Sequence, residues 1–458
     1  MAKCPNILFF FTDQQRWDTC GCYGQPMDVT PNLDQLAAEG VRFESAFTCQ
    51  PVCGPARACL QTGLWATQVG TFTNGIPLPL EAKTIAHHLG DAGYQTGYVG
   101  KWHLASRQQG REYWDAPVPP QRRGGYRDFW HAADVLEFTS HSYDGHMWDT
   151  AGNRVDFPQG RYRVDHQTDL ALEFLQNRDP DRPFFLMLSY LEPHHQNDND
   201  RYEGPAGSKK RFADCTIPPD LAAAGDLGDW QENYPDYLGC CASLDENLGR
   251  IRKFLADQGI LDETLIIYTS DHGSHFRTRN SEYKRSCHDA CLRVPMVLRG
   301  PGYRGGKVIE ELVSLLDLPP AILASAGLEA PVSFAGRDLQ PLAEGKAEDW
   351  PEDVFAQISE DHIGRTLRTK RWKYEVWVPG SGGASRPGSQ EYTEARLYDL
   401  QTDPHELNNR VCDPDLAAVR GQLAKRLVER MTQAGEAPAI IHPAEVPAPD
   451  DGRFERKG

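Results

Sequence analysis

Long apolar stretches are missing from this sequence. No run approaches the roughly 20 residues that a helix needs to cross a bilayer, so we expect no membrane partner. The apolar run near the N-terminus, residues 7–11, is shorter than the roughly 7–15 residues of a signal-peptide core, and no basic segment precedes it. These absences predict a cytoplasmic protein.

Positive charge is scarce as well. Lysine and arginine together number 48 against 65 aspartates and glutamates, which gives a net charge of -17. This excess of negative charge argues against nucleic acid as a partner, because phosphate groups would be repelled. An anionic substrate would therefore need a local cluster of Lys, Arg, His or metal.

Regular cysteine spacing and internal repeats are also absent. The 12 cysteines occur at irregular intervals, unlike a disulfide scaffold, and we expect them to be free thiols. No internal repeat is visible along the chain. The 458 residues suit one large core with a smaller domain attached.

Strand-like and helix-like segments alternate over residues 1–350. This pattern predicts an α/β fold, with a large, mostly parallel sheet sandwiched by helices. Residues 351–437 change character and predict a smaller α+β domain on a short antiparallel sheet. Residues 438–458, which are Pro-rich and charged, are expected to form an extended tail.

The individual elements follow from apolar periodicity and from capping residues. Strands are predicted at residues 6–12, 95–100, 183–190, 265–270, 354–358, 365–367, 372–376 and 396–400. Helices are predicted from Pro31 to the stop at Gly40, at residues 84–89 and 164–177, through the apolar face from Tyr237 to Leu255, and at residues 416–433.

Four of the predicted strands end in polar residues. These residues are Asp13, Lys101, His194 and Asp271. Ligands of open parallel sheets bind outside the carboxyl ends of the strands, so we expect the four side chains to converge.

Two of these strand ends carry candidate metal ligands. Asp13 with Gln14, and Asp271 with His272, offer hard oxygen ligands and one imidazole. This set suits one divalent cation, Ca²⁺ first, with Mg²⁺ or Mn²⁺ as alternatives, whereas zinc would favour thiolates. A single Asp after a strand is often only a turn residue, so the prediction depends on both pairs.

Basic residues gather around the same point. Lys101, His103, His194 and Lys284 supply positive charge and proton-transfer groups. A lone His is more often structural and a lone Lys is usually solvated, so the inference depends on the set. Such a set suits a site that binds a tetrahedral oxyanion and hydrolyses its ester.

Three cysteines lie close together in the stretch CQPVCGPARACLQTG at residues 49–63. One alternative is a zinc-stabilised or ligand-binding module, with the metal held by Cys49, Cys53 and Cys59, or by Cys287, His288 and Cys291. These spacings fit no common zinc pattern.

Within this stretch Cys53, Pro55 and Arg57 have the form C-x-P-x-R. The motif resembles the signature of the type I sulfatases, members of the alkaline phosphatase superfamily. Further segments resemble the same family: PNILFFFTDQQ, VTPNLDQLAAEGVRFESAF, GYQTGYVGKWHL, EPHH, YTSDHG, YKRSCHDACLRVPMVLRGPG, RTKRWKYEVW and LYDLQTDPHELNN. Together they span about residues 4 to 410, and VTPNLDQLAAEGVRFESAF resembles the helix that follows the family's first strand.

The resemblance implies a nucleophile and its metal. In the family a maturation enzyme oxidises the cysteine to formylglycine, whose hydrate attacks sulfur, so Cys53 would carry this group at a helix N-terminus. Arg57 would hold the hydrated aldehyde. The cation would be bound by Asp13, Gln14, Asp271 and His272, in an alkaline-phosphatase-like fold.

The resemblance also implies roles for the surrounding polar residues. Lys101 and Lys284 would clamp sulfate oxygens, and His194 or Lys284 would protonate the leaving alcohol. His103 would accept a proton as the sulfated hemiacetal expels sulfate. Asn74 would touch the sulfate.

The substrate is expected to be a sulfated sugar or oligosaccharide, or an aryl sulfate. The segment with His275 and Arg277 resembles one in bacterial carbohydrate sulfatases, and these two residues, with His288, are the candidate substrate-binding residues. The alternative reading is a solvated basic loop. Asp-Gln and Asp-His pairs also occur in phosphonate monoester hydrolases and phosphodiesterases of the superfamily, which are the alternative enzymes. A further alternative is a chain left unmodified at Cys53 that binds sulfated sugars without turning them over.

Overall fold

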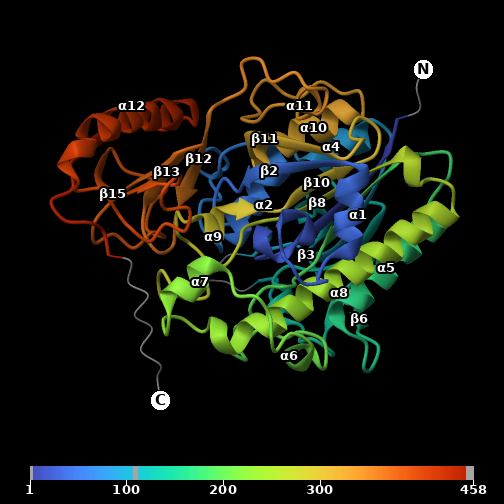
Figure 1. Ribbon diagram of the computed structural model, residues 1–458. Helices are drawn as coiled ribbons and strands as arrows, with labels where there is room; N and C mark the ends of the chain where they lie inside the picture. Colours follow the sequence, from blue (N-terminus) through green and yellow to red (C-terminus); the bar gives the residue numbers. More distant parts are fainter. Residues whose placement is uncertain (1–3, 107–111, 450–458) are drawn as a thin grey trace.

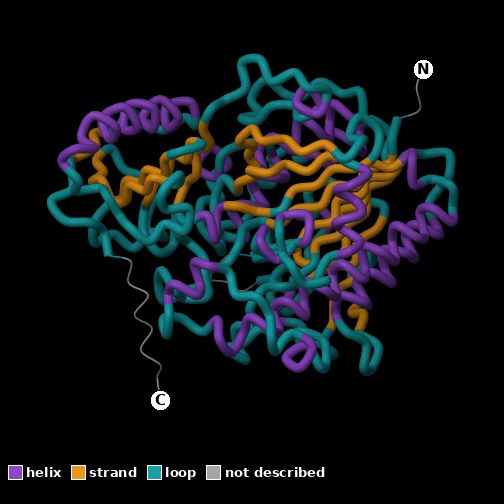
Figure 2. Tube along the Cα trace, viewed as in Figure 1, coloured by secondary structure: helices purple, strands orange, loops and turns teal. Residues whose placement is uncertain are grey.

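Two β-sheets of different size organise the chain. The computed structural model describes residues 4–106 and 112–449. In Figures 1 and 2 the large sheet runs through the centre of the molecule, and the small sheet lies beside it under helix α12 (Ala417–Gln433). No helix in these ranges combines the length and the apolar composition of a membrane-spanning segment.

The large sheet is mixed and has 11 strands within the described ranges. In spatial order the strands are β11 (Lys307–Ser314), β2 (Val41–Phe47), β10 (Met296–Arg299), β8 (Thr264–Ser270), β1 (Asn6–Thr12), β7 (Phe184–Ser189), β3 (Gln95–Lys101), β4 (Phe129–Ala133), β5 (His146–Trp148) and β6 (Arg154–Asp156), with β9 (Arg293–Val294) beside β2. The central strands β8, β1, β7, β3 and β4 are parallel, whereas β10, β9, β5 and β6 pair antiparallel.

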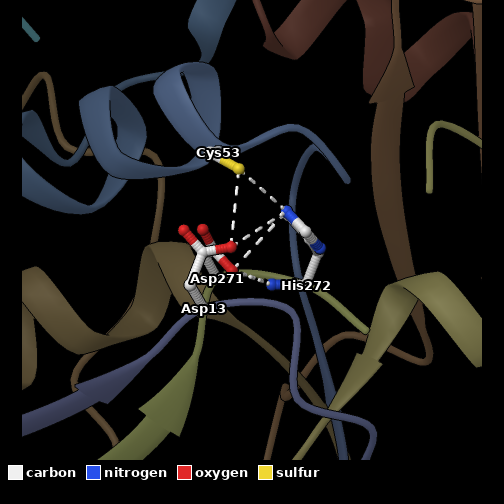
Figure 3. Close-up of side chains that lie close together, drawn as sticks. All are labelled: Asp13, Cys53, Asp271 and His272. Atoms are coloured by element: carbon white, nitrogen blue, oxygen red, sulfur yellow. Dashed lines mark hydrogen bonds and ion pairs between the residues drawn. The ribbon is translucent and has the colours of Figure 1, made fainter. Parts of the chain in front are cut away.

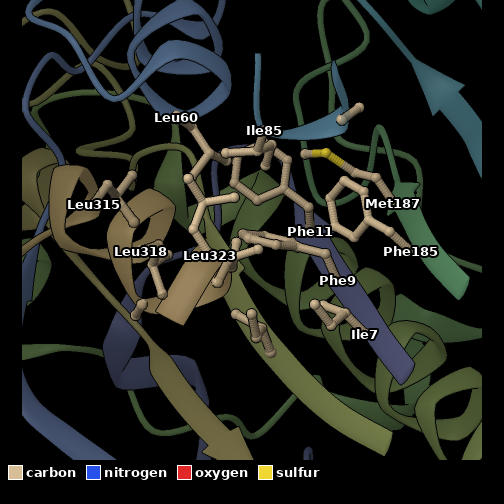
Figure 4. Packing of buried hydrophobic residues seen from close by; sticks show 14 of the residues in the cluster. Ile7, Phe9, Phe11, Leu60, Ile85, Phe185, Met187, Leu315, Leu318 and Leu323 are labelled. Atoms are coloured by element: carbon tan, nitrogen blue, oxygen red, sulfur yellow. The ribbon is translucent and has the colours of Figure 1, made fainter. Parts of the chain in front are cut away.

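Strand β1 shows why the sheet is covered on both faces. Successive side chains of a strand point to opposite sides, and β1 is apolar at every position from Ile7 to Phe11. Ile7, Phe9 and Phe11 enter one core, seen in Figure 4, and Leu8 and Phe10 enter the other. A strand with two apolar faces is stable only between two helical layers.

The two helical layers come from different parts of the sequence. One core contains residues of α2 (Cys53–Thr62), α4 (Ile85–Asp91), α10 (Leu318–Ser325) and α11 (Gln340–Ala343). The other contains residues of α1 (Pro31–Glu39), α5 (Arg163–Asn177) and α8 (Trp230–Asp257). The remaining helices are α3 (Ala66–Val69), α6 (Ser208–Arg211), α7 (Pro219–Ala224) and α9 (Asp289–Leu292).

Neighbouring parallel strands bring the predicted polar residues to one edge. The strands β8, β1, β7 and β3 are consecutive in the sheet. Lys101 is the last residue of β3, and Asp13 and Asp271 directly follow β1 and β8. The predicted convergence is therefore confirmed at the carboxyl edge of the four central strands.

The small sheet contains β12 (Asp353–Ile358), β13 (Gly364–Thr369), β14 (Trp372–Trp377), β15 (Glu391–Asp399) and β16 (Ile440–His442). Leu423, Leu427 and Met431 of α12 recur every four residues and pack on it. One prediction needs correction, because residues 440–442 form β16, which pairs parallel with β15. The rest of the predicted tail to residue 449 lies largely outside regular structure, and residues 450–458 fall outside the described ranges.

Most predicted elements agree with the structure to within a few residues, but several strands were not predicted. The segment VRFESAF, which follows the predicted helix end at Gly40 and was assigned to no strand, is strand β2. Its alternating burial, with Val41 and Phe43 inward, matches a strand rather than a helix. Strands β4, β5, β6, β10 and β11 were also missed.

A buried charged cluster crosses the small sheet. His362 contacts Glu375 through Nε2 at 3.0 Å and Asp361 through Nδ1 at 2.7 Å. Glu375 also accepts a hydrogen bond from Arg396 at 2.5 Å. Burial lowers the pKa of His362, but the two carboxylates outweigh it and raise this pKa to about 9.

This raised pKa predicts a pH-dependent stability. The contribution of charged His362 is fully present below its unfolded-state pKa of about 6.5 and is lost as the pH rises through about 9. In His362→Gln we expect a loss on the order of 2 kcal/mol at pH 6 that shrinks toward pH 9, measured by urea unfolding. His442→Gln, at an exposed position, is the control. An equal loss at both pH values would contradict the assignment.

Candidate active site

Cys53 lies at the carboxyl edge of the large sheet, at the first position of helix α2 (Figure 3). Its Sγ is 2.7 Å from Lys284 Nζ, 3.3 Å from His272 Nε2 and 3.5 Å from Asp13 Oδ1. Burial raises the pKa of the thiol, but Lys101, Lys284 and His272 outweigh this and hold it well below its ordinary value. The position therefore favours an anionic group at the start of the helix.

The predicted metal ligands meet beside Cys53. Ligand atoms of Asp13, Asp271, His272 and Cys53 all lie within 4.8 Å of one another, and all four side chains are buried. The His272 ring is oriented by Nδ1, which contacts Gly273 O at 2.9 Å, so Nε2 faces the carboxylates.

Two further observations show that these residues fit a cation. Gln14 donates through Nε2 to Tyr202 and Ser274, while its buried Oε1 has no hydrogen-bond partner. Burial and the neighbouring Asp13 raise the pKa of Asp271. A hard divalent cation would satisfy the amide oxygen and offset the repulsion between the carboxylates.

Arg57 lies beneath the two carboxylates. It donates through Nη2 to Asp13 at 2.9 Å and Asp271 at 3.4 Å, and through Nη1 to Lys101 O and Ser189 Oγ. The contact of Arg57 with a hydrated aldehyde at position 53 stays a prediction. Arg57 comes four residues after Cys53 on α2. Its side chain points toward the strand ends and offsets the charge of the Asp13 and Asp271 carboxylates.

Lys101 is shared between Asp13 and a residue that the sequence did not indicate. Its buried Nζ is 2.9 Å from Asp13 Oδ2 and 3.2 Å from Glu137 Oε1. Burial raises the pKa of Glu137, but Lys101, His194 and His103 outweigh this and lower it to about 2. Glu137 follows no predicted strand, so no local pattern marks it.

Two histidines complete the centre. His194 Nε2 lies 3.2 Å from Lys284 Nζ and 4.0 Å from Asp13 Oδ1, and its Nδ1 is 2.6 Å from His195 O. His103 helps to hold the pKa of the Cys53 thiol below its ordinary value. The structure therefore brings the predicted catalytic and metal residues to one point.

A cavity of about 400 Å³ opens beside His103 and Asn74. The other lining residues are Thr73, Gly75, Ser106, Trp114, Val135, Glu137, Phe138, Asn197, Arg285, Glu360 and Ala384. At its rim Trp114 and Phe138 stack with ring centroids 4.3 Å apart, and Phe138 is 46% exposed. Except for Asn74 and His103, none of these residues was predicted.

The backbone is strained at this site. In the described part of the chain nine non-glycine residues have positive φ, and four of them belong to the centre or the cavity: Gln14 (68°), His103 (58°), Arg285 (71°) and Glu360 (71°). Strained conformations persist only where the surroundings impose them, and they cluster at functional sites.

A family model decides which kind of site this is. The model described as Sulfatase matches residues 5–328, which is more than half of the chain. The chain belongs to the sulfatase family. A second model, described as the C-terminal part of N-sulphoglucosamine sulphohydrolase, matches residues 281–433.

Individual sulfatases resemble this chain over most of its length. It is 30% identical to the uncharacterized sulfatase YidJ of Escherichia coli (strain K12). It is 27% identical to the N-acetylglucosamine-6-O-sulfatase of Bacteroides thetaiotaomicron. Each of these two comparisons covers 94% of this chain and 87% of the relative. The solved structure of BT4656 in complex with its substrate D-glucosamine-2-N,6-O-disulfate has a TM-score of 0.76 and 25% identity, and covers 94% of this chain and 98% of that chain.

Three residues predicted to bind substrate in this sulfatase instead contact the protein itself. His275 is buried, with Nε2 at 3.2 Å from Lys284 O. Arg277 forms ion pairs with Asp200 and Asp229, and His288 Nε2 is 3.1 Å from Tyr398 Oη. None of the three lines the cavity beside His103 and Asn74. The segment that contains His275 and Arg277 is therefore part of the scaffold in this structure.

The cysteine alternatives are not supported either. Cys49 and Cys59 pack in a small apolar cluster with Ala66 and Leu316. Among the described residues the one candidate metal group of His, Cys, Asp and Glu is the group around Cys53, which contains neither cysteine. Cys49 and Cys59 are therefore buried core residues.

The fit to a cation leads to a stability prediction. Calcium added to metal-free protein should raise the Tm by several degrees, because a ligand that binds only the folded state stabilises it. Asp271→Asn should lose this response, while its metal-free Tm stays within about 3 °C of wild type, since the carboxylate repulsion is removed.

Asp198→Asn is the matched control, because Asp198 is half-exposed and pairs with His141 away from the centre. It should keep the response to calcium. If Asp271→Asn responds like wild type in differential scanning calorimetry, the cation binds elsewhere.

Proposed function

We propose that this sulfatase hydrolyses the sulfate ester of a small sulfated sugar, with the hydrated aldehyde made from Cys53 as nucleophile. The observation that carries the proposal is the position of Cys53. It begins helix α2 and contacts Lys284, His272 and Asp13 at once. A group in this place is surrounded by the charges that an attacking oxygen and a sulfate need.

The cationic side chains would bind the sulfate. Lys101 and Lys284 are fully or nearly fully buried, so their attraction for an anion is weakly screened. A bound divalent cation, Ca²⁺ in our proposal, would supply Lewis acidity toward the sulfate and the nucleophile. Asp13, Gln14, Asp271 and His272 would hold it.

Proton transfer would fall to the groups on either side of Cys53. Lys284 Nζ lies between Cys53 Sγ at 2.7 Å and His194 Nε2 at 3.2 Å, so Lys284 and His194 share one hydrogen bond. This pair would deliver a proton to the leaving alcohol. His103, at the cavity side of Cys53, would take the proton from the remaining hydroxyl when sulfate is released.

The cavity supports a sugar as the leaving group. Its volume of about 400 Å³ suits a molecule of one or two rings. The Trp114 and Phe138 rings offer a flat apolar surface at the rim, while Asn197 and Ser106 add hydrogen-bonding groups. The similarity to the N-acetylglucosamine-6-O-sulfatase and to BT4656 points the same way.

Conversion of Cys53 is the first test. After co-expression with a formylglycine-generating enzyme, mass spectrometry of the peptide around Cys53 should show the mass loss from thiol to aldehyde. Cys53→Ala should then lower kcat on 4-nitrophenyl sulfate by about 1000-fold or more, because the nucleophile is gone.

Cys59→Ala is the matched control, because this cysteine is equally buried but packs in the apolar cluster. Its activity per folded molecule should equal that of wild type. Full activity of Cys53→Ala would overturn the mechanism. A higher kcat/KM on phosphonate or phosphate esters than on any sulfate ester would favour the phosphonate monoester hydrolase alternative.

The aromatic rim gives a second prediction. Phe138→Ala should raise the KM for D-glucosamine-2-N,6-O-disulfate about fivefold and leave kcat nearly unchanged, because stacking on the leaving group is lost while the sulfate end stays intact. Tyr143→Ala, an exposed aromatic position outside the cavity, should leave both constants unchanged. An unchanged KM in Phe138→Ala would remove the rim from the substrate site.

A further inference from the structure

A carboxylate from the C-terminal domain lines the active-site cavity. Glu360 follows β12 in the sequence, yet its side chain lies beside Asn74 and is only 10% exposed. A negative charge next to a site for an anion would weaken binding unless it were neutralised. The contacts of Glu360 show what offsets this charge and what the residue holds.

Glu360 contacts three residues, Thr73, Asn74 and Arg285. Its Oε1 accepts hydrogen bonds from Asn74 N at 2.5 Å and from Thr73 Oγ1 at 2.9 Å. Its Oε2 lies 2.6 Å from Arg285 Nη2 and 3.4 Å from Asn74 Nδ2. Arg285 therefore neutralises the carboxylate, and the charge does not face the sulfate site uncompensated.

Two of these residues, Asn74 and Arg285, also bind the turn around Cys53. Asn74 Oδ1 accepts a hydrogen bond from Gly54 N at 2.9 Å, and Arg285 N donates to Pro51 O at 3.2 Å. A Cβ at Gly54 would lie 2.8 Å from Asn74 Oδ1, so only glycine permits this approach. Residues 51–54 are thus held from two sides by groups that Glu360 positions.

The backbone of Glu360 is itself constrained. Its φ is 71°, as is that of Arg285, a conformation that side chains other than glycine rarely adopt. Glu360 pairs with Gly383 of the loop between β14 and β15. A Cβ at Gly383 would lie 2.5 Å from Glu360 N, so the two segments touch closely. The C-terminal domain keeps Glu360 in a strained but fixed position.

We infer that Glu360 is a positioning residue of the active site, which acts through Asn74 and Arg285 to fix the turn that carries Cys53. The inference rests on the proposed function, in which Cys53 provides the nucleophile. It assigns the C-terminal domain a part in catalysis. Both ends of the Asn74 amide are thereby fixed, because Oδ1 accepts from Gly54 N and Nδ2 donates to Glu360 Oε2.

A double-mutant cycle tests this inference. Glu360→Gln should lower kcat on 4-nitrophenyl sulfate about 10- to 100-fold with KM within about threefold, because the nucleophile is misaligned but the sulfate ligands remain. Asn74→Ala should cause a similar loss. Because both changes act on the same turn, the double variant should be about as active as either single variant.

Glu394→Gln is the matched control, because this buried glutamate of the same domain contacts Tyr374 and Arg420 instead of the active site. Its activity per folded molecule should equal that of wild type, whatever its Tm. Unchanged kcat in Glu360→Gln, or losses that multiply in the double variant, would overturn the inference.

Two further readouts separate this inference from the proposed function. The double-mutant cycle is measured on the aryl ester, sulfate or phosphate, that the wild-type protein hydrolyses. A preference for phosphate would overturn the proposed substrate, but the kcat values of the variants could still be compared. Crystal structures of wild type and Glu360→Gln should show the Asn74 to Gly54 hydrogen bond broken in the variant. Its persistence with unchanged geometry would overturn the inference even if no ester is hydrolysed.

Discussion

The active site depends on two buried carboxylates held close together. Asp13 and Asp271 would repel each other at this distance and burial, and burial strengthens the repulsion. Arg57 and Lys101 offset it through ion pairs with Asp13, and Arg57 also reaches Asp271. The four residues lie on or directly after β1, β8, α2 and β3. The ion pairs therefore connect the central strands to the helix that carries Cys53.

The parts of the site differ in how they are supported. The metal pairs and the lysine of β3 stand on the central parallel strands, where the backbone is fixed by neighbours on both sides. The cavity walls come from loops and from the small domain, including Trp114, Phe138 and Glu360. In the proposed function, the metal ligands therefore lie on the rigid sheet, and the residues that contact the sugar lie on segments that can change without disturbing it.

The sequence predicted what depends on local pattern. Apolar runs located the central strands, and the polar residues at their ends, such as Asp13 and Asp271, located the site. Pairings between distant segments were not predictable, because no spacing marks them. Glu360 meets Asn74 across 286 residues, and Glu137 lies in no predicted element. His275 and Arg277 were predicted to bind substrate for the same reason, because their partners within the protein appear only in the folded chain.

The burial of Cys53 has a consequence for how the protein is made. The side chain is 1% exposed and is enclosed by Lys284, His272 and Asp13 from three distant segments. In the proposed function, the enzyme that oxidises Cys53 would have to reach this side chain before the three segments close around it. Modification and folding would then compete in time, and a molecule that folded first would keep its thiol.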